Sequence, residues 1–258
     1  GAGKSTVVPI SLLNESWLEN KVIIMLEPRR VAVRMVAVQM AKLLGEEVGQ
    51  SVGYQVKMES CYSKQTKLLV VTEAILVRKL QSDQALEDVA MVIFDEFHER
   101  SIHTDLSLAL CLQVQELLRP DLKLLIMSAT LDSNELTNIL GNIPVINSKG
   151  KIYDVENIYL ETNIKQPDSK SINTLLLKIT LKAIKEDEGD ILVFLAGSRE
   201  IQKLQALLEE ALKDKNIEIL PLYSTLSKEK QDKAISKSDK RKIILSTNIA
   251  QTSLTIEG

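Results

Sequence analysis

The sequence predicts an α/β fold, in which mainly parallel sheets are flanked by helices. Short apolar runs, such as residues 22–26 and 89–94, are hydrophobic at consecutive positions and do not alternate with polar residues. This pattern is typical of strands that are covered on both faces, as in a parallel sheet. Longer segments with helical spacing lie between these runs. The alternation of strand and helix therefore indicates right-handed crossover connections.

Each expected element follows from its own local pattern. Four segments have helical spacing; three of them end at or near Gly45, Pro120 or Gly189, and the fourth, residues 199–213, is indicated by its apolar spacing alone. The predicted strands are residues 22–26, 68–71, 89–94, 124–127, 191–195 and 243–245. The predicted helices are residues 30–44, 104–118, 171–187 and 199–213.

A domain boundary is expected near residue 148. The segment 147–154 is polar and marked by glycine, and residues 161–171 have loop composition. We therefore predict two tandem domains, residues 1–148 and 149–258, each with several strands and helices.

The composition is that of an ordinary soluble globular protein, with 45% hydrophobic and 26% charged residues among 258. The net charge of −3 argues against a uniformly basic surface but permits a local basic groove. Aromatic residues make up only 3%, so platforms for base stacking are few. Cys61 and Cys111 stand apart, which predicts two small core residues in a reducing compartment and no disulfide framework or structural zinc site.

No apolar run reaches the roughly 18 residues that a membrane span requires. A cytoplasmic protein without a membrane segment is therefore expected. The sequence begins with GAGKST and no initiator methionine, and it stops at TIEG. We expect it to be a piece of a longer protein.

The first six residues, GAGKST, match the second half of the P-loop pattern GxxxxGK[ST]. In such a loop the glycines let backbone N–H groups approach phosphate oxygens at a helix N-terminus. Lys4 would reach the terminal phosphates, and Ser5 would hold Mg²⁺. The alternative is an ordinary turn that leads into a helix.

The stretch VIFDEFHERS, residues 92–101, places ionisable side chains at the end of an apolar strand. Burial of such charges without partners is costly. Asp95 suits the Mg²⁺ side of a nucleotide site and Glu96 suits orientation of the attacking water, so a cation and a triphosphate would neutralise the cluster. The alternative is a charged strand end that pairs with Arg100.

A zinc site at HERSIH is a further alternative. Zinc protease helices place two histidines four residues apart, on one face of a helix. His98 and His103 are five apart and point in different directions, and the chain has no third histidine.

Seven blocks then occur in an order that resembles the DEAH-box ATP-dependent RNA helicases and, within them, the bacterial HrpB type, in which Phe follows the acidic pair. They are GAGKST, EPRRVAV (27–33), VVTEAIL (70–76), DEFHERS (95–101), MSAT (127–130), VFLAGSREI (193–201) and STNIAQTSLTI (246–256). The resemblance covers nearly the whole chain, and the order makes it far more specific than any single block.

The resemblance implies two RecA-like domains that close on ATP, Mg²⁺ and single-stranded RNA, with DNA left open as a second substrate. Asp95 and Glu96 would coordinate the metal and activate water, and His98 would link the nucleotide site to the second domain. The implied nucleotide contacts are Gly1, Ala2, Gly3, Lys4, Ser5, Thr6 and Thr252. Ser128, Ala129 and Thr130 would couple hydrolysis to strand movement.

The implied RNA path is Arg29, Arg30, Thr72, Glu73, Ser198, Arg199 and Thr247. Hydroxyl and guanidinium groups hold phosphates without reading sequence, so weak sequence preference is expected.

Simpler interpretations stand beside these roles. Arg29 and Arg30 open a helix and could form a solvated charged face, and Thr72 and Ser198 could be helix N-caps.

The sequence also departs from the family pattern. Gln251 stands where the family has Glu, and the arginine-rich block that follows in the family is absent. Arg241 precedes its strand at the end away from the expected nucleotide side, so no catalytic arginine is expected in the chain and it should hydrolyse ATP poorly. Two functions therefore remain: an ATP-dependent RNA helicase, or an ATP-gated RNA-binding clamp without productive unwinding.

Overall fold

The computed structural model describes residues 3–129, 140–141, 143–148, 154–160, 171–212 and 216–251. The chain divides into two compact units, Gly1–Tyr153 and Asp154–Gly258. Each unit is described by itself.

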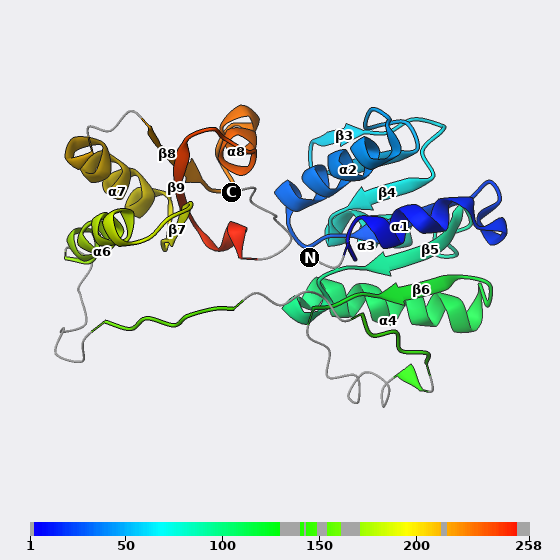
Figure 1. Ribbon diagram of the computed structural model, residues 1–258. Coiled ribbons are helices and arrows are strands. Elements are labelled where there is room, and N and C mark those ends of the chain that lie inside the picture. The colour runs from blue at the N-terminus through cyan, green and yellow to red at the C-terminus, as the bar shows by residue number, and fades with distance from the viewer. Residues whose placement is uncertain are drawn as a thin grey trace. The chain divides into compact units, whose positions relative to one another are not determined.

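The first unit is built on a six-stranded sheet with the order β3-β2-β4-β1-β5-β6 (Figure 1). All neighbouring strands are parallel except β2 and β3, which form an antiparallel pair. The strands are β1 Val22–Leu26, β2 Val52–Val56, β3 Glu59–Cys61, β4 Leu68–Val71, β5 Val89–Phe94 and β6 Lys123–Ile126. The prediction of a mainly parallel α/β sheet is confirmed.

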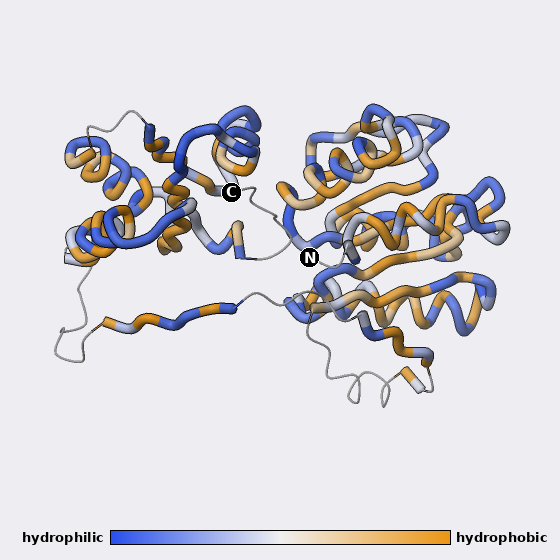
Figure 2. The backbone as a smooth tube through the Cα atoms, in the orientation of Figure 1, coloured by the Kyte–Doolittle hydropathy of each residue, from blue (hydrophilic) through white to orange (hydrophobic). Residues whose placement is uncertain are grey.

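Helices cover both faces of this sheet because its central strands are apolar on both sides, as the hydrophobic colouring of their backbone indicates (Figure 2). Ile23 and Met25 of β1 pack in one cluster with α2, whereas Ile24 and Leu26 pack in another with α3 and α4. The helices are α1 Val7–Ser11, α2 Arg30–Leu44, α3 Glu73–Ser82 and α4 Ile102–Leu117. Three 3₁₀ turns, η1 Leu12–Asn14, η2 Ser16–Leu18 and η3 Phe97–Glu99, complete the described elements of this unit.

The second unit contains a parallel three-stranded sheet with the order β7-β9-β8. Helices α6 and α7 pack on one face of it, against Ile243 and Leu245 of the central strand, and α8 packs against β8. The strands are β7 Ile191–Phe194, β8 Ile217–Leu222 and β9 Arg241–Ser246. The helices are α6 Ile172–Glu186, α7 Ser198–Ala211 and α8 Lys228–Ile235, with a 3₁₀ turn η4 at Asn248–Ala250.

Most predicted elements lie within two residues of the observed bounds. Helix α2 ends as expected, because Gly45 adopts a left-handed conformation with φ of 72° and caps it. Helix α4 begins at Ile102, two residues earlier than predicted, because the Ser101 side chain accepts a hydrogen bond from the Thr104 N–H and caps the helix there. Strands β2, β3 and β8 and helices α3 and α8 were not predicted.

The two cysteines differ. Cys111 is fully buried, and burial raises the pKa of its thiol to about 12. Cys61 is half-buried, and its thiol donates a hydrogen bond to the Val48 carbonyl at 3.3 Å. Among the helices that the structure describes, none has the length and apolar character to cross a membrane.

Candidate functional site

The parallel sheet of the first unit places several predicted site segments at one edge. The last residue of β1, Leu26, pairs with Val71 of β4 and with Phe94 of β5, and Phe94 pairs with Ile126 of β6. The segments that begin at Thr72 and Asp95 therefore leave the sheet at its carboxyl edge, as do those that begin after Leu26 and Ile126. Ligand sites of open α/β sheets lie at this edge.

The segment Gly3–Thr6 forms a tight turn that leads directly into α1. The Gly3 carbonyl accepts hydrogen bonds from the N–H groups of Thr6, Val7 and Val8 at 3.3, 2.7 and 3.3 Å. Gly3 has φ of 72°, and a Cβ atom there would lie 2.9 Å from Val7 Cγ2, so a side chain would be strained. The Lys4 ammonium donates to the Ser128 carbonyl at 2.6 Å, which brings the predicted loop and the MSAT segment together. Gly1 and Ala2 lie outside the described residues.

Asp95 is a buried carboxylate with one oxygen satisfied and one not. Its side chain is 4% exposed, and its N–H continues the ladder by donating to the Leu26 carbonyl at 3.1 Å. Oδ1 accepts the N–H of Glu96 at 2.9 Å. Oδ2 is buried and has no hydrogen-bond partner among the described residues. Because an orphaned carboxylate oxygen is costly, this atom fits the role of an oxygen ligand to Mg²⁺.

Glu96 has an unusual backbone and a perturbed carboxyl group. Its φ of 49° and ψ of 37° place a non-glycine residue in the left-handed region. Burial, with a further contribution from the neighbouring Asp95 charge, raises the pKa of the Glu96 carboxyl above its ordinary value. His98 Nδ1 lies 3.4 Å from Glu96 Oε2. A carboxyl group with a raised pKa at a sheet edge is a candidate proton acceptor.

The alternative interpretations of this cluster do not hold. Arg100 pairs with Asp105, at 3.1 and 3.2 Å, and lies over the Phe97 ring, so pairing of Arg100 with the acidic pair is wrong. His98 lies beside Glu96 in η3, whereas His103 is exposed in α4. Within the described residues, no three His, Cys, Asp or Glu side chains gather to hold a metal ion.

The predicted RNA contacts of the first unit stand at the start of two helices. Arg29 Nη2 lies 3.4 Å from Glu99 Oε2, and the exposed Arg30 donates to the Lys57 carbonyl at 3.1 Å. Thr72 occupies the N-cap position of α3, but its side chain forms no capping hydrogen bond. Glu73 is 9% exposed and is bonded to the hydroxyls of Ser101 and Thr104.

In the second unit, the predicted contacts follow two neighbouring parallel strands. Phe194 of β7 pairs with Ser246 of β9, so Thr247 and the segment that leads to Ser198 leave the sheet at the same edge. Ser198 is the first residue of α7, and Gly197 holds the N-cap position, so the interpretation of Ser198 as an N-cap is wrong. Arg199 is exposed. Ser128 and Ala129 follow β6 in the first unit, and Thr130 and Thr252 lie outside the described residues.

The sequence interpretation missed three residues around the acidic pair: Glu99, Ser101 and Thr104. The sequence showed Glu99 only as a charged residue of the HERS stretch and gave no indication of its contact with Arg29. Ser101 carried a signal, since a serine shortly before the start of a helical pattern, here predicted at residue 104, is a typical N-cap. Its second partner, Glu73, lies 28 residues away in sequence and could not be identified from local pattern.

A glycine turn, a lysine and an acidic pair whose first member is buried, all at the carboxyl edge of a parallel sheet, define a P-loop nucleotide-binding protein. The chain belongs to the DEAD/DEAH box helicase family, whose pattern matches residues 1–139. The helicase conserved C-terminal domain matches residues 171–258.

Curated relatives and solved structures agree with this assignment. The chain is 45% identical over 260 residues to the ATP-dependent RNA helicase HrpB of Escherichia coli (strain K12) and 36% identical over 261 residues to the ATP-dependent RNA helicase HrpA of Borreliella burgdorferi. Both alignments cover 100% of this chain and 31% of the relative, so the chain spans about a third of their length.

The fold is similar to that of two crystal structures from E. coli, each 45% identical in sequence. The DEAH/RHA helicase HrpB matches with a TM-score of 0.89 over 100% of this chain and 32% of that chain. The DExH-box NTPase HrpB matches with a TM-score of 0.78 over 99% of this chain and 31% of that chain. The likeness supports the expected RecA-like α/β architecture.

Proposed function

We propose that the chain is the two-domain core of an ATP-dependent RNA helicase, which couples ATP hydrolysis to movement along or unwinding of RNA. Residues 1–148 would form the ATP-binding RecA-like domain, and residues 149–258 would belong to the second. The observation that carries the proposal is the acidic pair at the end of β5, buried Asp95 and half-buried Glu96, on the same sheet edge as the Lys4 turn. The names of the relatives support ATP and RNA as substrates.

Mg²⁺ fits this site because Asp95 Oδ2 is a buried oxygen without a hydrogen-bond partner among the described residues. Asp95 and the Ser5 hydroxyl would hold the ion, since Mg²⁺ prefers oxygen ligands and binds nucleotides through few protein groups. When bound, it neutralises charge that develops on the phosphoryl oxygens.

The remaining residues of the site would bind, orient and accept a proton. The backbone of the Gly3 turn and the Lys4 ammonium face the phosphates, and Thr6 follows them at the start of α1. The Glu96 carboxylate orients the attacking water and accepts its proton. His98 Nδ1 lies 3.4 Å from Glu96 Oε2 without forming a hydrogen bond, and it would be the neighbour of that carboxylate during turnover. Because Lys4 bonds to the Ser128 carbonyl, release of Lys4 to a phosphate would change the MSAT segment, which is a route for coupling.

RNA would bind through hydroxyl and guanidinium groups at the carboxyl edges of the two sheets. Thr72 and Arg30 in the first unit, and Ser198, Arg199 and Thr247 in the second, suit phosphate oxygens. Affinity should therefore depend steeply on salt and only weakly on sequence.

The test is Glu96→Gln in the full-length protein, because the amide keeps the shape of the side chain and removes the proton acceptor. We expect ATP binding to persist while RNA-stimulated phosphate release falls by roughly 10² to 10⁴. The matched control is Glu116→Gln, which changes an exposed glutamate of α4 and should leave turnover unaltered. Turnover of Glu96→Gln within a few-fold of wild type would assign the water to another residue. A wild-type protein that binds RNA under ATP control without turnover would favour the clamp.

A further inference from the structure

Glu73 is a buried carboxylate whose partners all come from the beginning of another helix. It is the first residue of α3 and is 9% exposed. Its Oε1 accepts a hydrogen bond from the Ser101 hydroxyl at 2.7 Å and a second, short one from the Thr104 hydroxyl. The two hydroxyl oxygens also lie 3.0 Å apart, so Glu73, Ser101 and Thr104 form one closed hydrogen-bonded group around this oxygen. The carboxylate is therefore engaged inside the protein and is poorly suited to meet a phosphate, which carries the same charge.

The two hydroxyls belong to the beginning of α4, where Ser101 is the N-cap residue and Thr104 lies in the first turn. Ser101 Oγ also accepts the Thr104 N–H at 3.0 Å. The negative charge of Glu73 thus lies at the positive end of a 16-residue helix, where it is stabilised. The result is a direct connection between the first turn of α3 and the first turn of α4.

The connection matters because of what precedes each helix. Thr72, a predicted RNA contact, comes directly before Glu73, and the 95–101 segment with the acidic pair ends at Ser101. That segment has left-handed residues at Glu96 and Arg100, so its path depends on anchors at both ends. One end is fixed by the sheet, through the Asp95 N–H to the Leu26 carbonyl, and the other by the cap that holds Glu73.

A second contact joins the same segment to the other predicted RNA-binding helix. Arg29, which precedes α2, lies 3.4 Å from Glu99, with both side chains about one-fifth exposed. The beginnings of α2 and α3 are thus each bonded to the 95–101 segment, one by an ion pair and one by hydroxyl groups.

We propose that Glu73 is a positioning residue, not an RNA contact: it transmits RNA binding at the start of α3 to the Glu96 carboxylate through Ser101. The inference rests on the proposed function, because it assigns the route by which RNA stimulates ATP turnover. A shift of Thr72 on a phosphate would move Glu73, and with it the cap at the end of the catalytic segment. This revises the prediction that Glu73 lines the RNA path.

The test compares Glu73→Gln, Ser101→Ala and Ser101→Thr in the full-length protein. Gln cannot accept from two hydroxyls with the strength of a carboxylate, and Ala removes the relay hydroxyl, whereas Thr retains both the hydroxyl and the capping ability. We expect Glu73→Gln and Ser101→Ala to lower the ratio of RNA-stimulated to basal turnover about tenfold, with the KM for RNA unchanged within about twofold. Ser101→Thr should restore stimulation. In the double variant Glu73→Gln/Ser101→Ala the two effects should not add, because each substitution alone already disrupts the same Glu73–Ser101 hydrogen bond.

The outcomes separate the possibilities. A KM for RNA that rises while maximal stimulation is retained would make Glu73 a direct RNA contact. Unchanged stimulation in both variants, or additive effects in the double variant, would overturn the relay. If the wild-type protein shows no ATP turnover, the proposed function itself fails, which differs from loss of stimulation alone. Thermal unfolding of each variant, with Glu116→Gln as the matched control, identifies a variant that merely fails to fold.

Discussion

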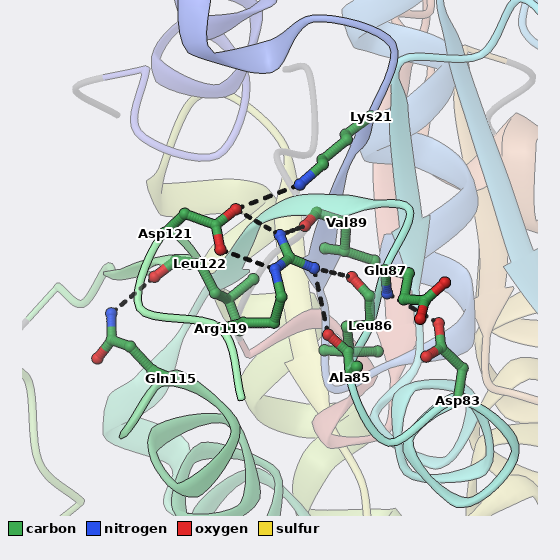
Figure 3. Close-up of polar contacts among 10 residues, drawn as sticks. All are labelled: Lys21, Asp83, Ala85, Leu86, Glu87, Val89, Gln115, Arg119, Asp121 and Leu122. Carbon is green, nitrogen blue, oxygen red and sulfur yellow. Dashed lines mark hydrogen bonds and ion pairs between the residues drawn. The ribbon is translucent and has the colours of Figure 1, made fainter. Parts of the chain in front are cut away.

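The two ends of strands β5 and β6 carry charged clusters that are built in opposite ways. At the amino ends, the Arg119 guanidinium donates hydrogen bonds to three backbone carbonyls and to the Asp121 carboxylate (Figure 3). At the carboxyl ends, Asp95 keeps a buried oxygen without a hydrogen-bond partner among the described residues, and Glu96 has a strained backbone. The contrast indicates that the first cluster serves folding and the second is prepared for a ligand, since buried charges in a purely structural role are paired.

The Arg119 guanidinium closes the loop between α3 and β5. It donates to the carbonyls of Ala85, Leu86 and Val89 at 3.2, 2.7 and 3.1 Å. It also forms a two-pronged ion pair with Asp121, at 2.8 and 2.7 Å, and hydrogen bonding from Arg119 holds the pKa of the Asp121 carboxyl well below its usual range.

The second unit repeats this device. Arg241, the first residue of β9, donates to the carbonyls of Gly189, Ile184 and Asp187 at 2.5, 2.8 and 2.8 Å. These carbonyls belong to the end of α6 and to the loop that precedes β7, the neighbour of β9. In each unit, therefore, an arginine at the amino end of one strand holds the loop before the adjacent strand. These three hydrogen bonds of the Arg241 guanidinium all go to backbone carbonyls of its own unit.

The largest effect on stability should follow removal of the structural cluster. Arg119→Ala removes the guanidinium donor from three carbonyls and from Asp121, although the Leu86 carbonyl keeps the Val89 N–H and Asp121 keeps the Lys21 ammonium. We expect the free energy of unfolding of the first unit to fall by about 3 kcal/mol. Arg119→Lys should recover only part of this loss, because an ammonium lacks the planar fork. Denaturant unfolding of both variants measures the difference. ATP affinity at a temperature where the variants are folded should not change; a large change would mean that the two clusters are not separate.

At the carboxyl end of the sheet we expect the opposite pattern, in which ATP affinity changes and stability does not. Lys4→Ala removes the ammonium that would face the phosphates, so ATP affinity should fall about 10- to 100-fold, which corresponds to about 1.5–3 kcal/mol for a charged hydrogen bond. Stability without nucleotide should change little, because Lys4 bonds to a carbonyl in a half-exposed position. Equilibrium binding of a fluorescent ATP analogue measures the effect. Equal affinity in variant and wild type would contradict the assignment of the phosphate-binding loop.

The two clusters also differ in how far sequence could predict them. Lys4, Asp95 and Glu96 belong to short motifs, because phosphate and metal chemistry requires particular residue types at fixed spacing, and the pattern of apolar runs identified β1, β4 and β5. Arg119 could not be identified, since its partners are backbone carbonyls about 30 residues earlier that any sequence would provide. Strand β8 was missed because its run is interrupted by Glu218 and Pro221, which an edge strand tolerates.

The smallest effect is the sharpest test of the contrast, because one kind of substitution should change stability in opposite directions at the two ends. Both Glu96→Gln and Asp121→Asn replace a carboxylate by an amide of similar shape. In Glu96→Gln a non-glycine residue still occupies the left-handed backbone conformation at position 96. The backbone strain is therefore the same in the variant and the wild type. The comparison therefore isolates the charge.

The signs follow from the two pKa shifts. Burial raises the pKa of Glu96 in the folded protein, so the folded state binds more protons than the unfolded state between the usual glutamate value and the raised one, and wild-type stability decreases as the pH rises through this window. Glu96→Gln should thus be slightly more stable than wild type at pH 7, and the gain should vanish below about pH 4. The pKa of Asp121 is lowered, so its contribution is present at pH 7 and is lost only as the pH falls below the usual aspartate value of about 4. Asp121→Asn should therefore be less stable than wild type at pH 7.

Thermal unfolding without nucleotide or Mg²⁺, from pH 3 to pH 8, measures both differences. A stability loss for Glu96→Gln at pH 7 would mean that the Glu96 charge is paired in the folded state, and the carboxyl edge would then resemble the amino edge in its construction.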